Sequence, residues 1–286
     1  MKITRKGTSK ELLERDFANR DGSVLPSLFF PSLEQGGVAM NMITTREGGV
    51  SEGIFSSMNL TTGRGDCEEN VRENFARVAA AFGTDTEHCI CSHQVHETNV
   101  LRVGKEEAGM GISRSMEWES ADGLVTNEPG LVLATFYADC VPLLFVDPVK
   151  RAVGASHSGW RGTVGKMGAK TIQKMREEFG TDPADVLVGI GPSICADHYE
   201  VSEDVAEEFR KAFPDQKDQL LTFWGNPGHY QLNLWEACRT TLIEAGVREE
   251  NIHVTDICTA CNPTVLFSHR ATQGKRGNFA ALIMLH

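Results

Sequence analysis

A cysteine and a histidine end two apolar segments on either side of a short turn. Cys140 follows the first segment, and His157 ends the second. Asp147 precedes Pro148, a combination that favours a turn, so we expect an antiparallel hairpin centred on Pro148 and Val149. This register pairs Cys140 with His157, with Cβ atoms about 4.5–5.5 Å apart, whereas a slip of one residue would place them on opposite faces. Such a pair can bind a metal ion or form a thiolate–imidazole couple.

His96 is the best third candidate, because it ends another segment expected to be a strand, in CSHQVHET. Two histidines and a cysteine leave one position open for water or substrate, the pattern of catalytic zinc. His93, three residues earlier on the strand, should face the other way. Asp139 either assists Cys140 as a supporting group or proton acceptor, or only caps the following turn. Each residue alone is typical of a structural position, and only their combination favours a functional site.

The overall charge and composition exclude several functions. The 286 residues carry a formal net charge of −11, which argues against a nucleic-acid-binding protein but not against a small anionic ligand held by local arginines. No apolar run approaches the ~20 residues of a membrane span, and the basic N-terminus lacks the apolar core of a signal peptide. We therefore expect a cytoplasmic protein with no membrane partner, in which the eight cysteines are reduced. The oligomeric state stays open.

The pattern of strands and helices predicts a single α+β domain with mixed sheets. Residues 1–36 are weakly patterned and are expected to form an N-terminal extension with at most one short helix, before a catalytic domain at 37–286. Within that domain strands come in runs and helices are irregularly interspersed, which favours mixed sheets over a regular βαβ winding. The helices are expected at 67–83, 162–180, 201–213 and 232–247, and the final strand at 277–285.

A C-x₂-C pair, Cys258 and Cys261, could be half of a structural zinc site with His253 or His269. No second C-x₂-C is present, so we expect no separate zinc site and interpret both cysteines as packing residues near the pocket. Cys89 and Cys91 are expected to share one face of a strand in the core.

Several motifs together resemble the YfiH/YlmD/FAMIN family, whose members are often labelled laccase-domain proteins. They span residue 38 to the C-terminus and include TTREGGVSEGIFSSMNL, HQVHET, ADGLVTNEPGLVLATFYADC, GASHSGWRGT and FSHRATQGKRGNFAALI. The resemblance implies an α/β/β/α layered sandwich. It also implies a zinc-dependent purine nucleoside phosphorylase acting on adenosine, inosine, guanosine and S-methyl-5'-thioadenosine, with adenosine deaminase activity. The implied partners are a purine nucleoside and phosphate.

The same resemblance implies a set of site residues. The zinc ligands would be His96, Cys140 and His157, all of which the motifs retain. Arg46 of TTREGG and Arg276 of GKRG would hold phosphate, since phosphorolysis requires cations near the attacking anion. The residues that would bind ribose or purine, or otherwise only order loops, are Asn59 and Gln94. His269 stands where the family often has tyrosine, which could alter substrate contacts.

Three alternatives belong to other classes. Cys140 and His157 could act as nucleophile and base of a hydrolase, with an amide or acyl substrate such as a peptidoglycan precursor, a role the resemblance suggests for one bacterial branch. A copper oxidase is disfavoured because the chain has nine histidines and no His-x-His pair. A binding module without activity is the weakest alternative, because Cys, His and Arg around a cleft are poor material for a flat partner surface.

Overall fold

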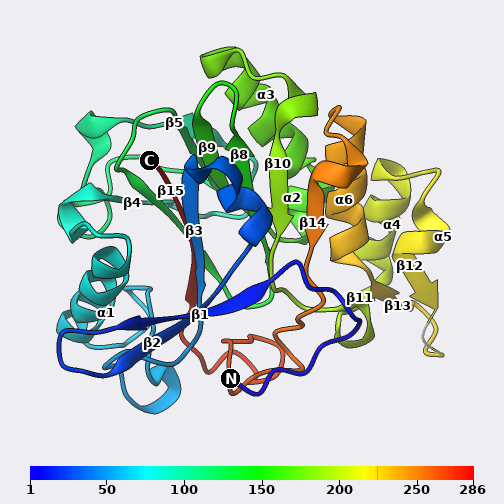
Figure 1. The fold of residues 1–286 in the computed structure, drawn as a ribbon. Coiled ribbons are helices and arrows are strands. Elements are labelled where there is room, and N and C mark those ends of the chain that lie inside the picture. The colour runs from blue at the N-terminus through cyan, green and yellow to red at the C-terminus, as the bar shows by residue number, and fades with distance from the viewer. Residues whose placement is uncertain (224) are drawn as a thin grey trace.

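Two six-stranded sheets stacked face to face form the centre of the molecule (Figure 1). The computed structural model describes residues 1–223 and 225–286. The first sheet contains, in spatial order, β1 (Leu13–Ala18), β2 (Val24–Phe29), β3 (Ala39–Thr44), β15 (Phe279–Leu285), β7 (Val132–Tyr137) and β4 (Cys89–Cys91). The second contains β14 (Ile252–Val254), β10 (Leu187–Ile190), β8 (Val141–Asp147), β9 (Ala152–Ser158), β6 (Gly123–Thr126) and β5 (Val100–Arg102).

Helices cover the outer faces of both sheets. They are α1 (Glu68–Ala81), α2 (Trp160–Val164), α3 (Met167–Phe179), α4 (Glu203–Ala212), α5 (Lys217–Leu220) and α6 (Leu234–Glu244). Helix α1 packs on the first sheet, and α3 and α6 pack on the second. A small sheet lies beside α4 and consists of β11 (Glu200–Ser202), β13 (His229–Leu232) and β12 (Leu221–Phe223). The predicted α+β class and α/β/β/α sandwich are therefore confirmed.

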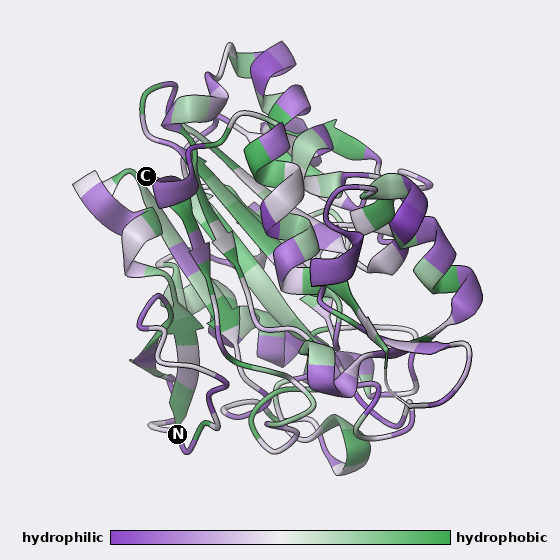
Figure 2. Cartoon of the chain, turned by 90° about the vertical axis from the view of Figure 1, so that its right-hand side faces the viewer, coloured by the Kyte–Doolittle hydropathy of each residue, from purple (hydrophilic) through white to green (hydrophobic). Residues whose placement is uncertain are grey.

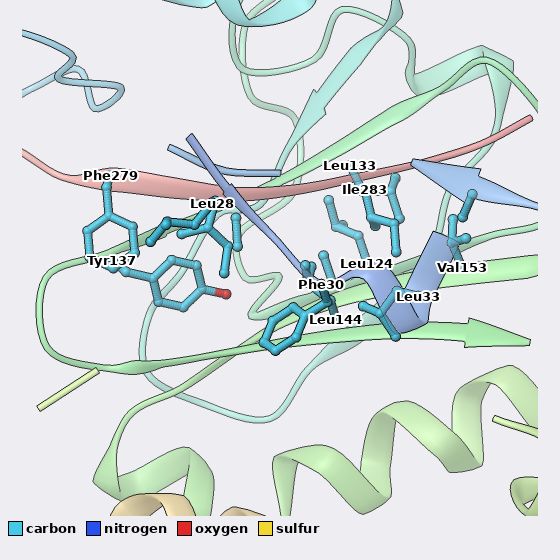
Figure 3. Packing of buried hydrophobic residues seen from close by; sticks show 14 of the residues in the cluster. Leu28, Phe30, Leu33, Leu124, Leu133, Tyr137, Leu144, Val153, Phe279 and Ile283 are labelled. Carbon is cyan, nitrogen blue, oxygen red and sulfur yellow. The ribbon is translucent and has the colours of Figure 1, made fainter. Parts of the chain in front are cut away.

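The core between the sheets explains why the strands are so apolar. Leu133 and Ile283 of the first sheet pack towards Leu124, Leu144 and Val153 of the second, and all five are fully buried (Figure 3). Strands covered on both faces read as continuous apolar runs rather than alternating ones, which is how β8 and β15 appear in the sequence. Figure 2 shows the hydrophobic strands inside the molecule and hydrophilic stretches on the outer helices.

The N-terminal segment differs from the expectation of one short helix. It contributes β1 and β2, which extend the first sheet through antiparallel pairing of β1 with β2 and of β2 with β3. A short 3-10 helix follows at Pro31–Gly37. Strand β1 was missed because it is an edge strand with exposed positions and therefore a weak hydrophobic pattern. Strand β2 is largely buried but contains Pro26, which argues against a strand in the sequence. The division into an N-terminal extension at 1–36 and a catalytic domain at 37–286 stays a prediction.

The β8–β9 hairpin exists, but the predicted register is wrong by two residues. Its pairs include Val141 with Ser158 and Pro142 with His157, so Cys140 lies just before the first pair. The turn occupies four residues, 148–151, instead of two. The wider turn forms because Asp147 Oδ1 accepts the N–H groups of residues 149 and 150 at 2.9 and 2.8 Å. A shift of two residues preserves the alternation of faces, so Cys140 and His157 still meet.

The expected helix at 162–180 is divided in two. Helix α2 ends at Val164 and α3 begins at Met167, and Lys166 between them has a left-handed backbone with φ of 61°. None of the helices in the described part of the chain combines the length and apolar character that crossing a bilayer requires.

Candidate active site

A cavity of about 800 Å³ opens where loops from both sheets meet. Its wall includes the β7–β8 connection, the end of β9, the loop after β4, the loop after β10 and the segment that precedes β15. Because strands from both sheets end here, residues distant in the sequence meet around one space.

His96, Cys140 and His157 converge in this cavity. Their ligand atoms all lie within 4.8 Å of one another, and the two imidazole rings are nearly perpendicular, with centroids 4.9 Å apart. His157 is held by β9 and is 3% exposed, whereas Cys140 is half-buried and His96 lies on an exposed loop. His96 adopts a φ of 66°, so it sits in a turn instead of at the strand end expected from the sequence.

Gly159 allows the three side chains to meet. A Cβ atom at this position would lie 3.1 Å from Cys140 Sγ, 3.3 Å from His96 Cδ2 and 3.9 Å from His157 Cε1. The first two distances are shorter than ordinary van der Waals contacts. The backbone of Gly159 therefore occupies a position beside the convergent sulfur and imidazole groups that no other residue type could take without displacing them.

Asp122 orients this group and was missed in the sequence. His157 donates from Nδ1 to Asp122 Oδ1 at 2.9 Å, which leaves its Nε2 free to face Cys140. The backbone N–H groups of Val95, His96 and Glu97 donate to the same carboxylate at 3.0, 3.1 and 3.0 Å. Asp122 is fully buried, and although burial raises its pKa, these hydrogen bonds and the charge of His157 lower it overall. One carboxylate thus fixes both histidines.

The pKa values of Cys140 and His157 are coupled through their contact. Burial would raise the pKa of the Cys140 thiol, but the facing His157 and His96 lower it to about 6. Burial would lower the pKa of His157, but Cys140 and Asp122 raise it to about 9. The group therefore favours a thiolate, which is the form of cysteine that binds metals and attacks electrophiles.

Asp139 lies in the cavity wall, where its carboxylate accepts three hydrogen bonds. Thr259 and Ser268 donate their hydroxyls to Oδ1 at 2.6 and 2.7 Å, and the backbone N–H of Arg270 donates to Oδ2 at 2.7 Å. Its φ of 89° turns the chain just before Cys140. These contacts connect the β7–β8 loop to the segment preceding β15. None of them involves His157, which is hydrogen-bonded to Asp122 instead.

The substrate residues expected from the sequence separate into two groups. Gln94, His269 and Arg276 line the cavity. Arg46 does not: its guanidinium donates to the carbonyls of Ser56 and Pro263 and lies beside a different surface depression.

Asn59 is likewise outside the cavity wall. It is fully buried, its side-chain oxygen accepts the N–H groups of Thr61 and Asn278, and its amide donates to Asp66 Oδ2. Gln94 lines the cavity, but its amide is hydrogen-bonded to both backbone groups of Phe136. The contacts of Asn59 and Gln94 fit the alternative that these residues order loops.

The cavity is strongly cationic, although the whole chain is acidic. The arginines in its wall are Arg64, Arg114, Arg270 and Arg276. Among the residues that the structure describes, Asp139 is the one acidic residue in the same wall. Arg64, Arg114 and Arg270 were not expected from the sequence, although Arg270 lies in the motif FSHRATQGKRGNFAALI. A cationic wall in an acidic protein indicates an anionic ligand.

Arg276 is half-buried, whereas the other three arginines of this wall are exposed. Its Nε is buried without a hydrogen-bond partner within 1–223 and 225–286. Burial and the nearby charge of Arg64 lower its pKa to about 10. His269 lies 3.5 Å from Arg276, and burial and the same arginine lower its pKa. An anion bound here would offset the positive charges that repel one another.

Comparison with known proteins places the chain in a family. The model for the multi-copper polyphenol oxidoreductase laccase family matches residues 40–286, and the chain belongs to this family. It is 37% identical over 244 residues to the purine nucleoside phosphorylase YlmD of Bacillus subtilis, across 84% of this chain and 86% of the relative. It is 32% identical over 230 residues to the adenosine deaminase RL5 of an unknown prokaryotic organism, across 79% and 86%.

Solved structures agree with this assignment. The YfiH protein of Bacillus licheniformis superposes with a TM-score of 0.86 at 33% identity, covering 91% of this chain and 96% of that one. YlmD of Geobacillus stearothermophilus superposes with a TM-score of 0.84 at 33% identity, covering 95% and 100%. The resemblance to the YfiH/YlmD family that the motifs carry is therefore confirmed.

Proposed function

We propose that the chain is a zinc-dependent purine nucleoside phosphorylase that acts on adenosine, inosine, guanosine and S-methyl-5'-thioadenosine, and that it also deaminates adenosine. The observation that carries this proposal is the convergence of His96, Cys140 and His157 in a cavity lined by arginines. The names of two relatives, a phosphorylase and a deaminase, support the same pair of activities. Eight free cysteines fit the cytoplasmic location that we also propose.

The donor set fits zinc. Two imidazole nitrogens and one thiolate leave a position open for a substrate atom or water, and the lowered pKa of Cys140 supplies the thiolate that zinc binds. Asp122 holds His157 with Nε2 directed to the same point, as carboxylates behind zinc-bound histidines do. When bound, zinc acts as a Lewis acid and increases the acidity of water.

The arginines would perform the second part of the chemistry. In phosphorolysis a phosphate oxygen forms a bond to C1′ of the ribose, while the bond from C1′ to the purine nitrogen breaks and the base leaves with the electron pair and a proton. Arg276 and Arg64 would hold the phosphate by charge-assisted hydrogen bonds. The unpartnered Nε of Arg276, buried in the described part of the chain, is a donor available for this anion.

Zinc fits better than the copper of the family's description. A multicopper oxidase needs several copper sites rich in histidine, and a blue-copper site adds an axial ligand such as methionine to two histidines and a cysteine. Within the described residues, the Cys/His groups number two and contain three histidines altogether. The cavity group also lies beside a cationic wall suited to phosphate, which a polyphenol oxidation does not require.

One observation favours a second candidate, a Cys-His hydrolase acting on an amide or acyl substrate such as a peptidoglycan precursor. Cys140, His157 and Asp122 form a connected series in which a carboxylate orients a histidine that faces a thiolate. That arrangement resembles the nucleophile, base and orienting group of cysteine hydrolases. The same sulfur cannot both bind zinc and act as a free nucleophile, so the two candidates make opposite predictions.

The test combines metal analysis with a phosphate-dependent inosine assay on the wild type and on Cys140→Ala. One equivalent of zinc, the one held by the cavity group, and the release of hypoxanthine with ribose 1-phosphate should both be lost in the variant. The matched control is Cys67→Ala, because Cys67 is exposed and contacts Glu69 at the start of α1. Full activity of zinc-free protein, or covalent acylation of Cys140 by an amide or ester substrate, would overturn the proposal in favour of a thiol hydrolase.

A further inference from the structure

A second group of metal-binding side chains lies beside the cavity, on two segments far apart in the sequence. Cys195 and His198 follow β10, and Cys258 and Cys261 follow β14. Strands β10 and β14 are parallel neighbours in the second sheet, so the segments after them leave the sheet at the same edge. A parallel bridge between Ser193 and Cys258 continues this pairing.

The four side chains face a common point. Their ligand atoms all lie within 4.8 Å of one another. His198 Nδ1 is 3.3 Å from Cys195 Sγ and 3.6 Å from Cys261 Sγ, and the backbone N–H of Cys195 donates to Cys258 Sγ at 3.2 Å. Such a backbone hydrogen bond stabilises negative charge on a sulfur. Thiols are weak hydrogen-bonding groups, so these contacts alone are a poor reason for three sulfurs and an imidazole to meet.

Spacing and charge also fit a metal. The sequence pattern is C-x₂-H followed by C-x₂-C, which supplies two pairs of ligands. Three thiolates and a divalent cation leave one net negative charge. The ammonium of Lys6 lies 2.7 Å from Asp197 Oδ2, within the C-x₂-H segment, and so places a positive charge near this group.

The expectation from the sequence was that Cys258 and Cys261 only pack. His253 and His269 were the histidines expected to complete a zinc site with these cysteines, if one existed. In the structure neither histidine lies beside the cysteines. His253 contacts Glu11 at 2.8 Å, and His269 lines the cavity. The second half of the pattern was not recognised because it is a C-x₂-H about 60 residues earlier in the chain, and only the parallel pairing of β10 with β14 joins the two halves.

We propose that Cys195, His198, Cys258 and Cys261 bind one zinc ion in a structural site of the Cys₃His type. Four protein ligands close a tetrahedral coordination shell and leave no position for a substrate, and soft thiolates with an imidazole select zinc over magnesium or calcium. The site does not depend on the proposed enzymatic function, because its ligands are separate from the cavity group.

The zinc would fix the part of the cavity wall that Asp139 and Arg270 form. Ile194 donates its N–H to the carbonyl of Asp139 at 3.0 Å, and Arg270 donates to the carbonyl of His198 at 3.1 Å. Thr259, between the two C-x₂-C cysteines, donates its hydroxyl to Asp139 Oδ1 at 2.6 Å. One ion would thereby connect three loops that carry side chains of the cavity.

The first test counts zinc per chain in full-length protein from which any affinity tag has been removed. We expect two equivalents in the wild type, one in Cys140→Ala, one in the double variant Cys258→Ser/Cys261→Ser, and none when all three changes are combined. His198→Gln should lower the zinc affinity of the second site only. His253→Gln is the matched control, because His253 belongs to β14, just before the C-x₂-C pair, contacts Glu11 instead of the cysteines, and should leave both equivalents in place.

A second measurement keeps the proposal testable if the serine variants fail to fold. Cobalt(II) replaces zinc in Cys140→Ala, which retains all four ligands of the second site, and sulfur-to-cobalt charge-transfer bands with a tetrahedral d–d spectrum are expected. Absence of these bands, a wild type with one zinc that only Cys140→Ala removes, or a disulfide between Cys195 and Cys258 under reducing purification would overturn the site. A chain that holds the second zinc but performs no phosphorolysis supports this site and overturns only the proposed function.

Discussion

The cavity group and the Cys₃His group are both built from cysteine and histidine, but they differ in number and surroundings. The first has three ligands, a buried carboxylate that orients His157, and a cationic wall around it. The second has four ligands and connects loops after two parallel strands. Three ligands that face an open space leave a coordination position of the metal free for a substrate. Four protein ligands complete the coordination shell and are suited to stabilising the fold.

Ligand type alone therefore does not assign a role to either group. Both groups would bind zinc through thiolate and imidazole, yet only the first has an open coordination position next to groups that could bind an anion. The number of ligands, their access to the cavity and the charges nearby distinguish a reactive site from a structural one. Substitutions that change one of these properties at a time should therefore affect the two groups differently.

The largest expected difference is between Cys140→Ala and Cys261→Ala. A metal that polarises a substrate contributes several kcal/mol to the transition state, and each 1.36 kcal/mol is a factor of ten. Cys140→Ala should therefore reduce kcat/KM for inosine about a thousandfold, whereas Cys261→Ala should retain most activity and lower Tm. Steady-state kinetics and thermal unfolding of both variants measure this, and equal losses of activity would remove the distinction between the groups.

Removing the orienting carboxylate should give the next largest effect. Asp122→Asn retains shape but weakens the hydrogen bond that fixes His157, and changes of this kind typically cost 10–100-fold in metal affinity or activity. The matched control is Asp147→Asn, since Asp147 is equally buried but lies at the far end of β8. Competition with a zinc-binding dye should show weaker binding at the cavity group for Asp122→Asn alone. Unchanged affinity would mean that the carboxylate has no role in ligand orientation.

The cationic wall gives a smaller and more specific prediction. A hydrogen bond to a charged group is worth about 1.5–3 kcal/mol, so Arg276→Met should raise KM for phosphate about thirtyfold, for a loss near 2 kcal/mol. Arg46→Met removes an equal charge outside the cavity and should leave this KM unchanged. Kinetics with phosphate as the varied substrate compare them, and an equal effect of both variants would show that overall charge, not position, attracts the anion.

The smallest expected effect on activity belongs to His198→Gln. This exposed ligand contributes one of four bonds at a site that shares no ligand with the cavity group, so kcat should change by only a few-fold. Zinc binding at a structural site is folding free energy, and each 1 kcal/mol lost lowers Tm by roughly 2–4 °C in a chain of this size. Calorimetry with and without added zinc should show the lower Tm. A thousandfold loss of kcat with unchanged Tm would instead place His198 in the reaction.

The sequence could predict the layers and the cavity histidines because both depend on local patterns. Continuous apolar runs indicated β8 and β15, and alternation of faces brought Cys140 to His157 even though the register was wrong by two residues. His96 and His157 also lie in motifs that the family resemblance covers. Strand β1 was missed because it is an edge strand with many exposed positions, and β2 because it contains Pro26, a residue disfavoured inside a strand.

The remaining site residues depend on contacts that the sequence does not display. Asp122 meets His157 because β6 pairs with β9, and Cys195 meets Cys258 because β10 pairs with β14. Arg46 was expected at the phosphate on the basis of its motif, but backbone carbonyls hold its side chain elsewhere. Strand order and side-chain direction decide these outcomes, and neither follows from residue spacing.

The position of β15 has a consequence for the order in which the molecule assembles. This strand lies between β3 and β7, and Ala280 donates its N–H to Thr44 Oγ1 across 236 residues of chain. During synthesis the first sheet therefore cannot be completed, because β3 and β7 lack the strand between them, until segment 279–285 has left the ribosome. Pairing at such a sequence separation is slow to form, and unpaired strand edges promote aggregation in the meantime. Nascent chains arrested before Phe279 should therefore depend more on chaperones than chains that contain β15.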